Sequence, residues 1–285
     1  LDGMLSFLEV DYAKAYVHAL TTDNIYVLRD VECGNRVMDI NFGILQYVDG
    51  NQTHSGAITV MHDVTSRYQL DKAQREFVAN VSHELRTPLT SIKGTSETIL
   101  LNPDMPLEIR QNFLNITVTE SDRMLHIIND LLTLSRFDNN RIQWSVSTFD
   151  LAQSLMHICN VLQTEALARG HRLTCDCEKT LPAISGDRER LEQVIMNIIS
   201  NAVKYTPENG RIEVRALKCD EHRVKITVRD NGIGIPKEDI PHLFERFYRV
   251  EKSRTSETGG TGLGLSIAKE IIDAHGGSIA VQSKV

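Results

Sequence analysis

Residues 78–99 read VANVSHELRTPLTSIKGTSETI, and this stretch decides the fold of the middle of the chain. Apolar and small residues recur in it at alternating intervals of three and four, at Val78, Val81, Leu85, Pro88, Ile92, Thr95 and Ile99. This spacing is typical of an α-helix that packs along a seam, as in a coiled coil. It predicts one long helix from about Ser66 to Leu101.

A second helix of the same kind is expected after a short loop, Asn102-Pro103-Asp104-Met105-Pro106. The spacing returns at Leu114, Val118, Ser121, Leu125, Ile128, Leu132 and Ser135. Further apolar residues widen the face of this helix beyond what one partner covers: Met124, Ile127, Leu131 and Leu134. We therefore expect a helical hairpin, and a four-helix bundle built from two hairpins of a homodimer. Periodicity does not count chains, so a third helix of the same chain is the alternative.

The segments on either side have mixed α/β character. Before the hairpin, β-rich runs at Val37–Val48 and Gly56–Val64 flank Asp49-Gly50-Asn51, which predicts an antiparallel pair of strands. After it, strands near Arg172–Cys177, Arg211–Leu217 and Val224–Arg229 alternate with helices near Leu151–Ala168, Arg188–Tyr205 and Ser266–His275. The predicted fold class is multidomain α+β. It comprises a partial α/β segment at 1–65, a helical hairpin at 66–140 and an α/β sandwich at 141–285.

Composition is that of an ordinary globular protein, with 285 residues, 41% hydrophobic and 24% charged. The 31 basic and 38 acidic side chains give a net charge of −7, which disfavours binding to a nucleic-acid backbone. Five cysteines, with one close pair at Cys175 and Cys177, indicate reduced thiols rather than a disulfide framework or a zinc site. No run approaches about 20 apolar residues, and the chain starts at Leu1, so we expect a fragment of a longer protein.

The first group of chemically informative residues lies within the first helix. His83 falls about 200° around the helix from Val81 and so is expected to face solvent. Glu84 can accept a hydrogen bond from its Nδ1–H, which leaves the Nε2 lone pair free as a nucleophile. Thr87 lies one turn on, where its hydroxyl can position a water beside Nε2, and Pro88 is expected to bend the helix. The alternative is an ordinary surface histidine on a polar helix face.

The second group lies on the helix near Arg188–Tyr205. Asn197 and Asn201 are four residues apart on one side, and their amide oxygens suit Mg²⁺ that also contacts phosphates. Lys204 can contact phosphate, and Tyr205 can offer a ring face. A plain amphipathic helix with an exposed Asn197 is the alternative.

Two glycine-rich stretches and an arginine pair complete the set. Asp230-Asn231-Gly232-Ile233-Gly234 follows a strand, so the carboxylate can accept an adenine amino proton, although such turns are common. Gly260-Thr261-Gly262-Leu263-Gly264 leads into a helix like a phosphate cradle, in neither a Walker nor a Rossmann context. Between them, Arg246 and Arg249 can balance charge on a transferred phosphoryl group, and Glu251–Thr258 is expected to form a mobile lid.

In this order the motifs resemble those of the sensor histidine kinases of two-component systems. His83–Pro88 is similar to the H box, Asn197–Tyr205 to the N box, Asp230–Gly234 to the G1 box, Leu243–Val250 to the F box and Gly260–Gly264 to the G2 box. The resemblance covers about Val78–Gly277. Phe77–Ser82 is most similar to the WalK/VicK group of cell-wall sensors, and Asp63-Val64-Thr65 resembles the end of a PAS domain.

The resemblance implies a dimeric phosphoacceptor hairpin followed by a Bergerat-type domain that binds ATP and Mg²⁺. ATP would phosphorylate His83, with Glu84 as base and Arg249 as the transition-state arginine, and Thr87 would support dephosphorylation of a partner. The remaining residues would bind the cofactor: Asn197 and Asn201 on the Mg²⁺ side, Lys204 and Arg246 at phosphate, Tyr205 and Asp230 at adenine, and Gly232, Gly234, Gly260, Thr261, Gly262, Leu263 and Gly264 as backbone contacts.

The implied partners are a second copy of the chain and the receiver domain of a response regulator, without nucleic acid. The family is usually membrane-anchored, so we expect the cytoplasmic portion of an anchored bacterial sensor, with both ends truncated. Two alternatives share some of the motifs: a conformational ATPase with the same nucleotide fold, and a dimeric scaffold with an inactive catalytic domain. The H box argues against the first, and the complete set of nucleotide motifs argues against the second.

Overall fold

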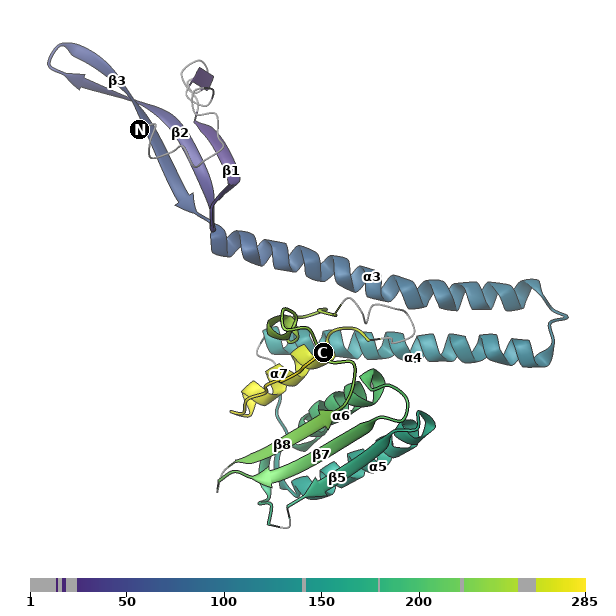
Figure 1. The fold of residues 1–285 in the computed structure, drawn as a ribbon. Helices are drawn as coiled ribbons and strands as arrows, with labels where there is room; N and C mark the ends of the chain where they lie inside the picture. Colours follow the sequence, from purple (N-terminus) through teal and green to yellow (C-terminus); the bar gives the residue numbers. More distant parts are fainter. Residues whose placement is uncertain are drawn as a thin grey trace. The chain divides into compact units, whose positions relative to one another are not determined.

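The computed structural model describes residues 14, 17–18, 25–139, 142–178, 180–220, 223–250 and 260–285 (Figure 1). The predicted lid at Glu251–Thr258 lies outside the described residues. The chain divides into two compact units, Leu1–Ala79 and Asn80–Val285, and each is described by itself.

The first unit contains a three-stranded antiparallel sheet in the order β1-β2-β3. Its strands are β1 (Tyr26–Cys33), β2 (Arg36–Asp49) and β3 (Gln52–Asp63). Asp49 pairs with Gln52 across a two-residue turn in which Gly50 has φ +61°, a conformation that glycine adopts without strain. The predicted antiparallel pair of strands is confirmed, and β1 extends it by a strand that the sequence analysis did not predict.

The junction between this sheet and the helix that follows is held by side chains of Asp63 and Thr65. The Asp63 carboxylate accepts hydrogen bonds from the Thr65 backbone N–H at 3.0 Å and from its hydroxyl at 2.6 Å. The Thr65 hydroxyl oxygen in turn accepts from the Val37 N–H at 2.9 Å. These bonds lower the pKa of Asp63 and fix the start of the helix against β2.

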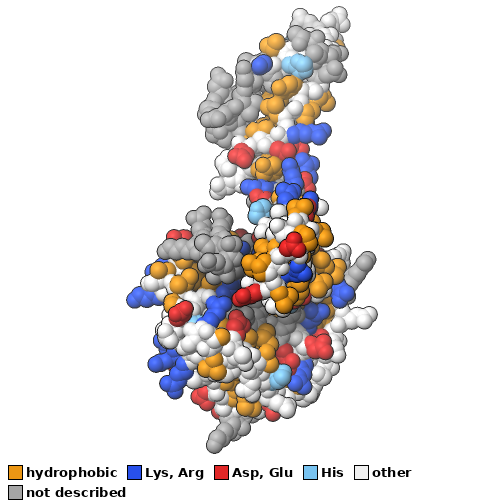
Figure 2. Space-filling model, turned by 90° about the vertical axis from the view of Figure 1, so that its right-hand side faces the viewer, with side chains coloured by type: hydrophobic (Ala, Val, Ile, Leu, Met, Phe, Trp, Pro, Cys, Tyr) orange, Lys and Arg blue, Asp and Glu red, His pale blue; other side chains and the backbone are white. Residues whose placement is uncertain are grey.

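The predicted helical hairpin is confirmed by α3 (Thr65–Leu101) and α4 (Leu107–Asp138). Helix α3 runs without interruption through Pro88, which is buried. The Thr95 and Thr117 hydroxyls, one on each helix, lie 2.8 Å apart and fix the two helices face to face. Figure 2 views the loop end of the hairpin, where hydrophobic side chains gather. Leu100, Leu101 and Leu107 are among the exposed residues there.

The two apolar faces of α4 differ in burial. Ile127 and Leu134 are fully buried within the chain. The predicted seam on the same helix instead faces outward, with exposed side chains at Leu114, Val118, Leu125, Ile128 and Leu132. Within the part of the chain that the structure describes, this second face has no helix of the same chain covering it.

The second unit continues with the predicted α/β sandwich. Its elements are β4 (Val146–Phe149), α5 (Leu151–Ala168), β5 (Arg172–Cys177), β6 (Ile184–Asp187), α6 (Arg188–Tyr205), β7 (Arg211–Lys218), β8 (Val224–Asp230), the 3-10 helix η1 (Ile240–His242) and α7 (Gly264–Ala274). Strand β5 is parallel to β7, which is antiparallel to β8, while β4 and β6 form a separate pair.

The core of this domain lies between the three-stranded sheet and helices α5 and α6 (Figure 1). The residues at its centre are fully buried: Leu155, Ile158, Ile199, Val203, Ile212, Val214 and Ala216. Helices α5 and α6 therefore pack their apolar faces on the sheet, and the C-terminal half of α6 is held where its polar face is available for a site. Among the described residues, no helix is both long enough and apolar enough to span a bilayer.

Candidate functional site

His83 is exposed at the middle of α3, as its position relative to Val81 predicts. Among the described residues its ring makes no hydrogen bond or ion pair. An exposed imidazole on a rigid helix can be reached by a second domain or another protein, as a phosphoacceptor must be.

Glu84 does not make the predicted hydrogen bond to His83 in this arrangement. Its Oε2 lies 3.5 Å from an Nη atom of Arg123 on α4, and Arg123 also contacts Glu120 at 3.8 Å. The Glu84 and Arg123 side chains are only 19% and 26% exposed, so the pair lies inside the hairpin. The register of α3 against α4 brings these residues together across 39 positions, and this contact turns Glu84 away from His83.

Thr87 also differs from its prediction. Its hydroxyl donates to the His83 backbone carbonyl at 3.3 Å rather than holding a group beside Nε2. This local bond is common for threonine in helices, and it leaves the side chain exposed one turn from His83.

Asn197 on α6 is packed under the start of α7. A Cβ atom at Gly264 would lie 2.5 Å from Asn197 Oδ1, so only glycine allows this approach. Asn197 is half-buried rather than exposed, and its Nδ2 is buried with no hydrogen-bond partner among the described residues. Asn201, one turn on, is also half-buried. The two predicted amides and the last glycine of the loop therefore meet.

The other end of the site joins Tyr205 to the loop after β8. Gly232 lies so close to Tyr205 that an added Cβ would be 2.7 Å from the Tyr205 carbonyl oxygen. The Gly232 N–H donates to Asp230 Oδ1 at 2.8 Å, and Asp230 is exposed at the start of the turn. At Gly234, with φ +73°, a Cβ would be 2.4 Å from the Lys284 carbonyl oxygen.

Lys204 is surrounded by positive charge. Burial, together with the nearby Arg249, Arg123 and Arg169, lowers its pKa to about 8. Its ammonium lies 5.1 Å from the centre of the Tyr205 ring. A cation that is both desolvated and crowded by other cations gains strongly when an anion binds beside it. The cluster therefore fits phosphate groups.

The loop before α7 packs on the segment that carries the two arginines. Gly262 has φ +69°, and its Cβ would lie 2.7 Å from the Phe247 backbone. The Phe247 N–H donates to the Gly262 carbonyl at 3.0 Å. Leu263 is fully buried, the Thr261 hydroxyl oxygen accepts from its N–H at 3.1 Å, and Gly260 begins the described part of the loop. Among the described residues no side chain caps the start of α7, so its first N–H groups suit a phosphate.

The two arginines of this segment have different positions. Arg249 lies near Lys204, as a phosphate-side residue would. Arg246 donates to both carboxylate oxygens of Asp138, at 2.8 and 2.6 Å, and lies 3.8 Å from Glu270. Its guanidinium is therefore engaged with the end of α4 in this arrangement. A contact between Arg246 and phosphate remains a prediction, and it requires this pair to open.

An apolar contact accompanies that ion pair. Leu134 of α4 is buried with Leu263, Ile267 and Ile271 of the loop and α7. Trp144, the single tryptophan, packs edge-on to His275 at 5.0 Å and against Phe137 at 5.9 Å. The residues that hold the nucleotide-site loop against the hairpin were missed by sequence reasoning, because their partners lie more than 100 positions away. The available signal was the widened apolar face of α4, which includes Leu131 and Leu134.

The residues present fit a magnesium nucleotide. Two backbone segments, at Gly232 and Gly264, approach α6 so closely that a Cβ would collide, a cationic cluster lies at one end, and a buried amide group lies at Asn197. Amide oxygens of Asn197 and Asn201 are ligands that Mg²⁺ accepts together with phosphate oxygens.

Family models match both parts of this arrangement. Residues 73–140 match the His Kinase A (phospho-acceptor) domain. Residues 186–285 match the histidine kinase-, DNA gyrase B- and HSP90-like ATPase family. The fold and site thus define a protein of the histidine-kinase class, in which a phosphoacceptor hairpin is joined to an ATPase domain.

Relatives narrow this class. The chain is 40% identical to the sensor protein kinase WalK of Staphylococcus aureus over 281 residues, 98% of this chain and 67% of the relative. It is 40% identical to the sensor histidine kinase WalK of Bacillus subtilis (strain 168) over 252 residues, 87% of this chain and 40% of that protein. The chain belongs to the sensor histidine kinases, and it spans about two fifths to two thirds of these relatives' lengths.

Solved structures of histidine kinases have a fold similar to that of this chain. The Acinetobacter baumannii histidine kinase AdeS matches at 26% identity and TM-score 0.55, over 67% of this chain and 86% of that one. Full-length ShkA in complex with AMPPNP matches at 29% identity and TM-score 0.52, over 73% of this chain and 44% of its own. The fold of a third kinase, ThkA, solved with the response regulator TrrA, is similar at TM-score 0.56 over 94% of this chain and 77% of that one, with 22% identity.

Proposed function

We propose that this chain transfers the γ-phosphoryl group of Mg-ATP to Nε2 of His83 and passes it on to an aspartate of a separate response regulator. The observation that carries the proposal is the pairing of an exposed histidine on the matched phosphoacceptor hairpin with a nucleotide site assembled around α6. In this proposal Glu84 acts as base after it leaves Arg123, and Arg249 balances charge on the transferred group.

ATP is held along the C-terminal half of α6. Asn197 and Asn201 hold the metal, Lys204 and the uncapped start of α7 face phosphate, and Asp230 and Tyr205 face adenine. Bound Mg-ATP supplies the phosphoryl group. The related ShkA, which was solved with AMPPNP, supports a nucleotide of this kind. The exposed Thr87 is the residue that we assign to the reverse reaction on the regulator.

We also propose that the chain acts as a homodimer. The exposed face of α4 carries the residues that the seam predicted, including Leu125 at 58% and Leu132 at 52% exposure. A second hairpin would bury this face and complete a four-helix bundle. The match to the phosphoacceptor domain supports the same assembly.

The first unit is proposed to be part of a PAS-like sensor domain. Its antiparallel sheet and the Asp63–Thr65 hydrogen bonds at the start of α3 support this assignment. Anchoring in a membrane, proposed from the family, would require segments beyond those described here.

The test is incubation with γ-labelled ATP and Mg²⁺, comparing the unchanged chain with His83→Gln. We expect label on the unchanged chain that is lost in acid and stable in base, as a phosphohistidine is, and none on the variant. Lys93→Gln, a substitution of an exposed residue farther along α3, is the matched control, and this variant should be labelled normally.

The outcomes separate the alternatives. ATP hydrolysis without label on either protein would favour a conformational ATPase. Nucleotide binding with neither label nor hydrolysis would favour a signalling scaffold. The H box and the match to the phosphoacceptor domain favour neither of these.

A further inference from the structure

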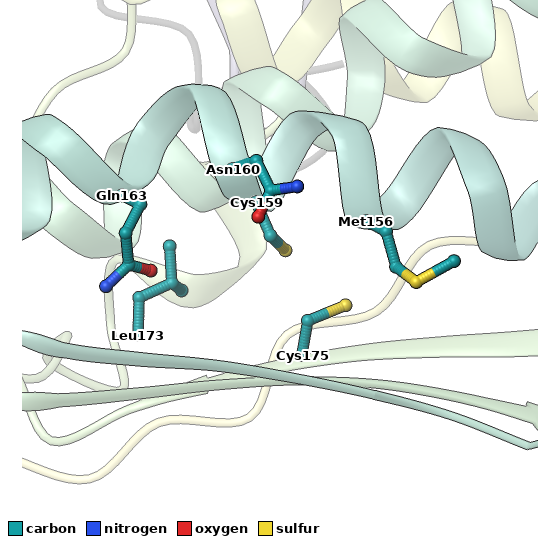
Figure 3. A pocket seen from close by; sticks show the side chains of 6 residues that line it. All are labelled: Met156, Cys159, Asn160, Gln163, Leu173 and Cys175. Atoms are coloured by element: carbon teal, nitrogen blue, oxygen red, sulfur yellow. The ribbon is translucent and has the colours of Figure 1, made fainter.

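Three of the five thiols gather on one side of the ATPase domain, away from the nucleotide site. Cys159 lies on α5, and Cys175 and Cys177 lie two residues apart on β5, so both project from the same face of that strand. Helix α5 packs on this face, with Cys175 and Cys177 against the core that contains Cys159. Figure 3 shows the Cys159 and Cys175 side chains directed into the same space between helix and strand.

The thiols contact one another. Cys175 Sγ lies 3.9 Å from Cys177 Sγ, and the Cys159 and Cys175 side chains line the same cavity. The Cys175 thiol lowers the pKa of Cys159, while the neighbouring Cys159 and burial raise the pKa of Cys175. The two thiols therefore differ in acidity, because Cys159 loses its proton more readily and Cys175 keeps its proton. Thiol–disulfide exchange needs this combination of an attacking thiolate and a neighbouring thiol.

A cavity gives small molecules a route to the pair. Its volume is about 290 Å³, and it is lined by Met156, Cys159, Asn160, Gln163, Leu173 and Cys175. Cys159 itself is only 5% exposed, but Met156 and Asn160 at the rim are exposed. The cavity therefore connects a buried thiol with the surface.

We propose that Cys159 and Cys175 form a redox-active dithiol, which low-molecular-weight disulfides oxidise through this cavity to a disulfide between α5 and β5. The Cys159 thiolate attacks one sulfur of a disulfide RSSR, forms a mixed disulfide and releases one thiolate RS⁻. The Cys175 thiol then loses its proton and attacks the Cys159 sulfur, which releases the second RS⁻. Two electrons pass from the two cysteines to RSSR, whose products are two thiols once protons are taken up.

Cys175 rather than Cys177 is the partner of Cys159 in this step, since Cys175 lines the cavity together with Cys159 and Cys177 is not among the lining residues. A bond between Cys175 and Cys177 is disfavoured, because residues two apart on a strand have Cα atoms about 6.6 Å apart, near the upper limit for a disulfide. The Cys159–Cys175 bond would instead tie helix to sheet beneath α6, whose Glu192 accepts a hydrogen bond from Ser154 of α5 at 2.6 Å.

The test uses the full chain with Cys33→Ser and Cys219→Ser, which removes the two thiols outside the cluster. The reduced protein is incubated with oxidised glutathione, its remaining thiols are alkylated in denaturant, and peptides are mapped by mass spectrometry. We expect loss of two hydrogen atoms, one alkylated thiol at Cys177, and a peptide pair joined through Cys159 and Cys175.

Two variants isolate the mechanism. Cys177→Ser should form the same crosslink to the same extent. Cys175→Ser should stop at a glutathione mixed disulfide on Cys159, in at least tenfold excess over any crosslink to Cys177. A crosslink between Cys175 and Cys177, glutathione retained on Cys159 when Cys175 is present, or no reaction before the protein unfolds would overturn the proposal. None of these readouts depends on kinase activity.

Discussion

The hairpin and the ATPase domain bury very different amounts of their sequences. Helix α5, with 18 residues, buries seven of them in the described chain, whereas α3 and α4, with 37 and 32 residues, bury two and three. Both regions are rich in apolar side chains at helical spacing. The difference shows that the ATPase domain completes its core within one chain, while the hairpin leaves an apolar face for another molecule.

This contrast separates the two halves of the proposed function. The proposed nucleotide site is built by backbone contacts on the closed core of the ATPase domain, so we expect its geometry not to depend on a partner. His83, the proposed phosphoacceptor, lies on a hairpin with an apolar face that no described helix of the chain covers. Conditions that alter the association of two hairpins should therefore affect the surroundings of His83 more than they affect the nucleotide site.

The largest expected effect is on the core of the ATPase domain. Leu155 is fully buried, so Leu155→Ala should destabilise this domain by about 3–5 kcal/mol through lost burial and the cavity left behind. Denaturant unfolding followed by circular dichroism would measure the loss, which should not depend on protein concentration.

Leu167→Ala is the matched control on the same helix, because Leu167 is 61% exposed. It should change the free energy of unfolding by less than about 0.5 kcal/mol. Similar losses for both variants would mean that the observed packing of α5 against the sheet is wrong.

The next effect concerns the open face of the hairpin. Leu125→Glu places a charge where a second hairpin is proposed to pack, and the lost burial of one leucine in each protomer, about 1.5–3 kcal/mol apiece, should weaken dimerisation by about 100-fold or more. Sedimentation equilibrium over a range of concentrations would measure the dissociation constant.

Leu101→Glu, at the loop end and 80% exposed, is the corresponding change outside the seam. It should leave the dissociation constant within about twofold. If the unchanged chain sediments as a monomer at all accessible concentrations, the alternative that this face is covered by another segment or protein gains support.

The sequence predicted the regions that local patterns define. Helices α5 and α6 were predicted with the ends that the structure has, and the N-terminus of each is fixed by a side-chain cap, at Asp150 and Asp187. Strands β4 and β6 were not predicted, because each has four residues and no clear alternation. Gly186 in β6 reflects tertiary packing, since a Cβ there would lie 2.8 Å from Leu191 and 2.9 Å from His275.

The site was predicted as a set of residue types rather than as a set of contacts. Motif order placed Asn197, Gly264 and Gly232 in one site, and the structure brings the first two together and Gly232 to the end of α6. The ion-pair partners of Glu84 and Arg246 could not be predicted from the sequence. Each depends on the register between elements far apart in the chain, which no local spacing encodes.

A smaller effect is expected where the two regions meet. Arg246→Gln removes the ion pair with Asp138, and because both side chains are partly exposed the contact should contribute less than about 1 kcal/mol. The loss should still loosen the contact between α4 and α7. Fluorescence of Trp144, which packs on Phe137 and His275, should shift to longer wavelength as the contact becomes more hydrated.

Arg215→Gln breaks a surface pair with Glu213 within one strand and serves as the control. Its Trp144 emission should match that of the unchanged chain. An unchanged spectrum in Arg246→Gln as well would mean that the apolar contact of Leu134 alone holds the two regions together.

The smallest effect is a pH dependence of nucleotide affinity. Burial and neighbouring arginines lower the pKa of Lys204 to about 8, and a bound phosphate would raise it, so binding takes up a proton as pH rises through 8. Between pH 7 and pH 8 the affinity for ATP should fall by about twofold. Without ligand, the stability of the fold depends on pH in the opposite direction. The lowered pKa of Lys204 favours the neutral amine, so the free energy of unfolding increases between about pH 8 and pH 10.5.

The proton taken up on nucleotide binding can be counted by titration calorimetry in buffers of different ionisation enthalpy. In Lys204→Arg the side chain stays charged throughout this range, so proton uptake at this position should vanish while binding persists; uptake equal to that of the unchanged chain would assign the proton to the nucleotide instead.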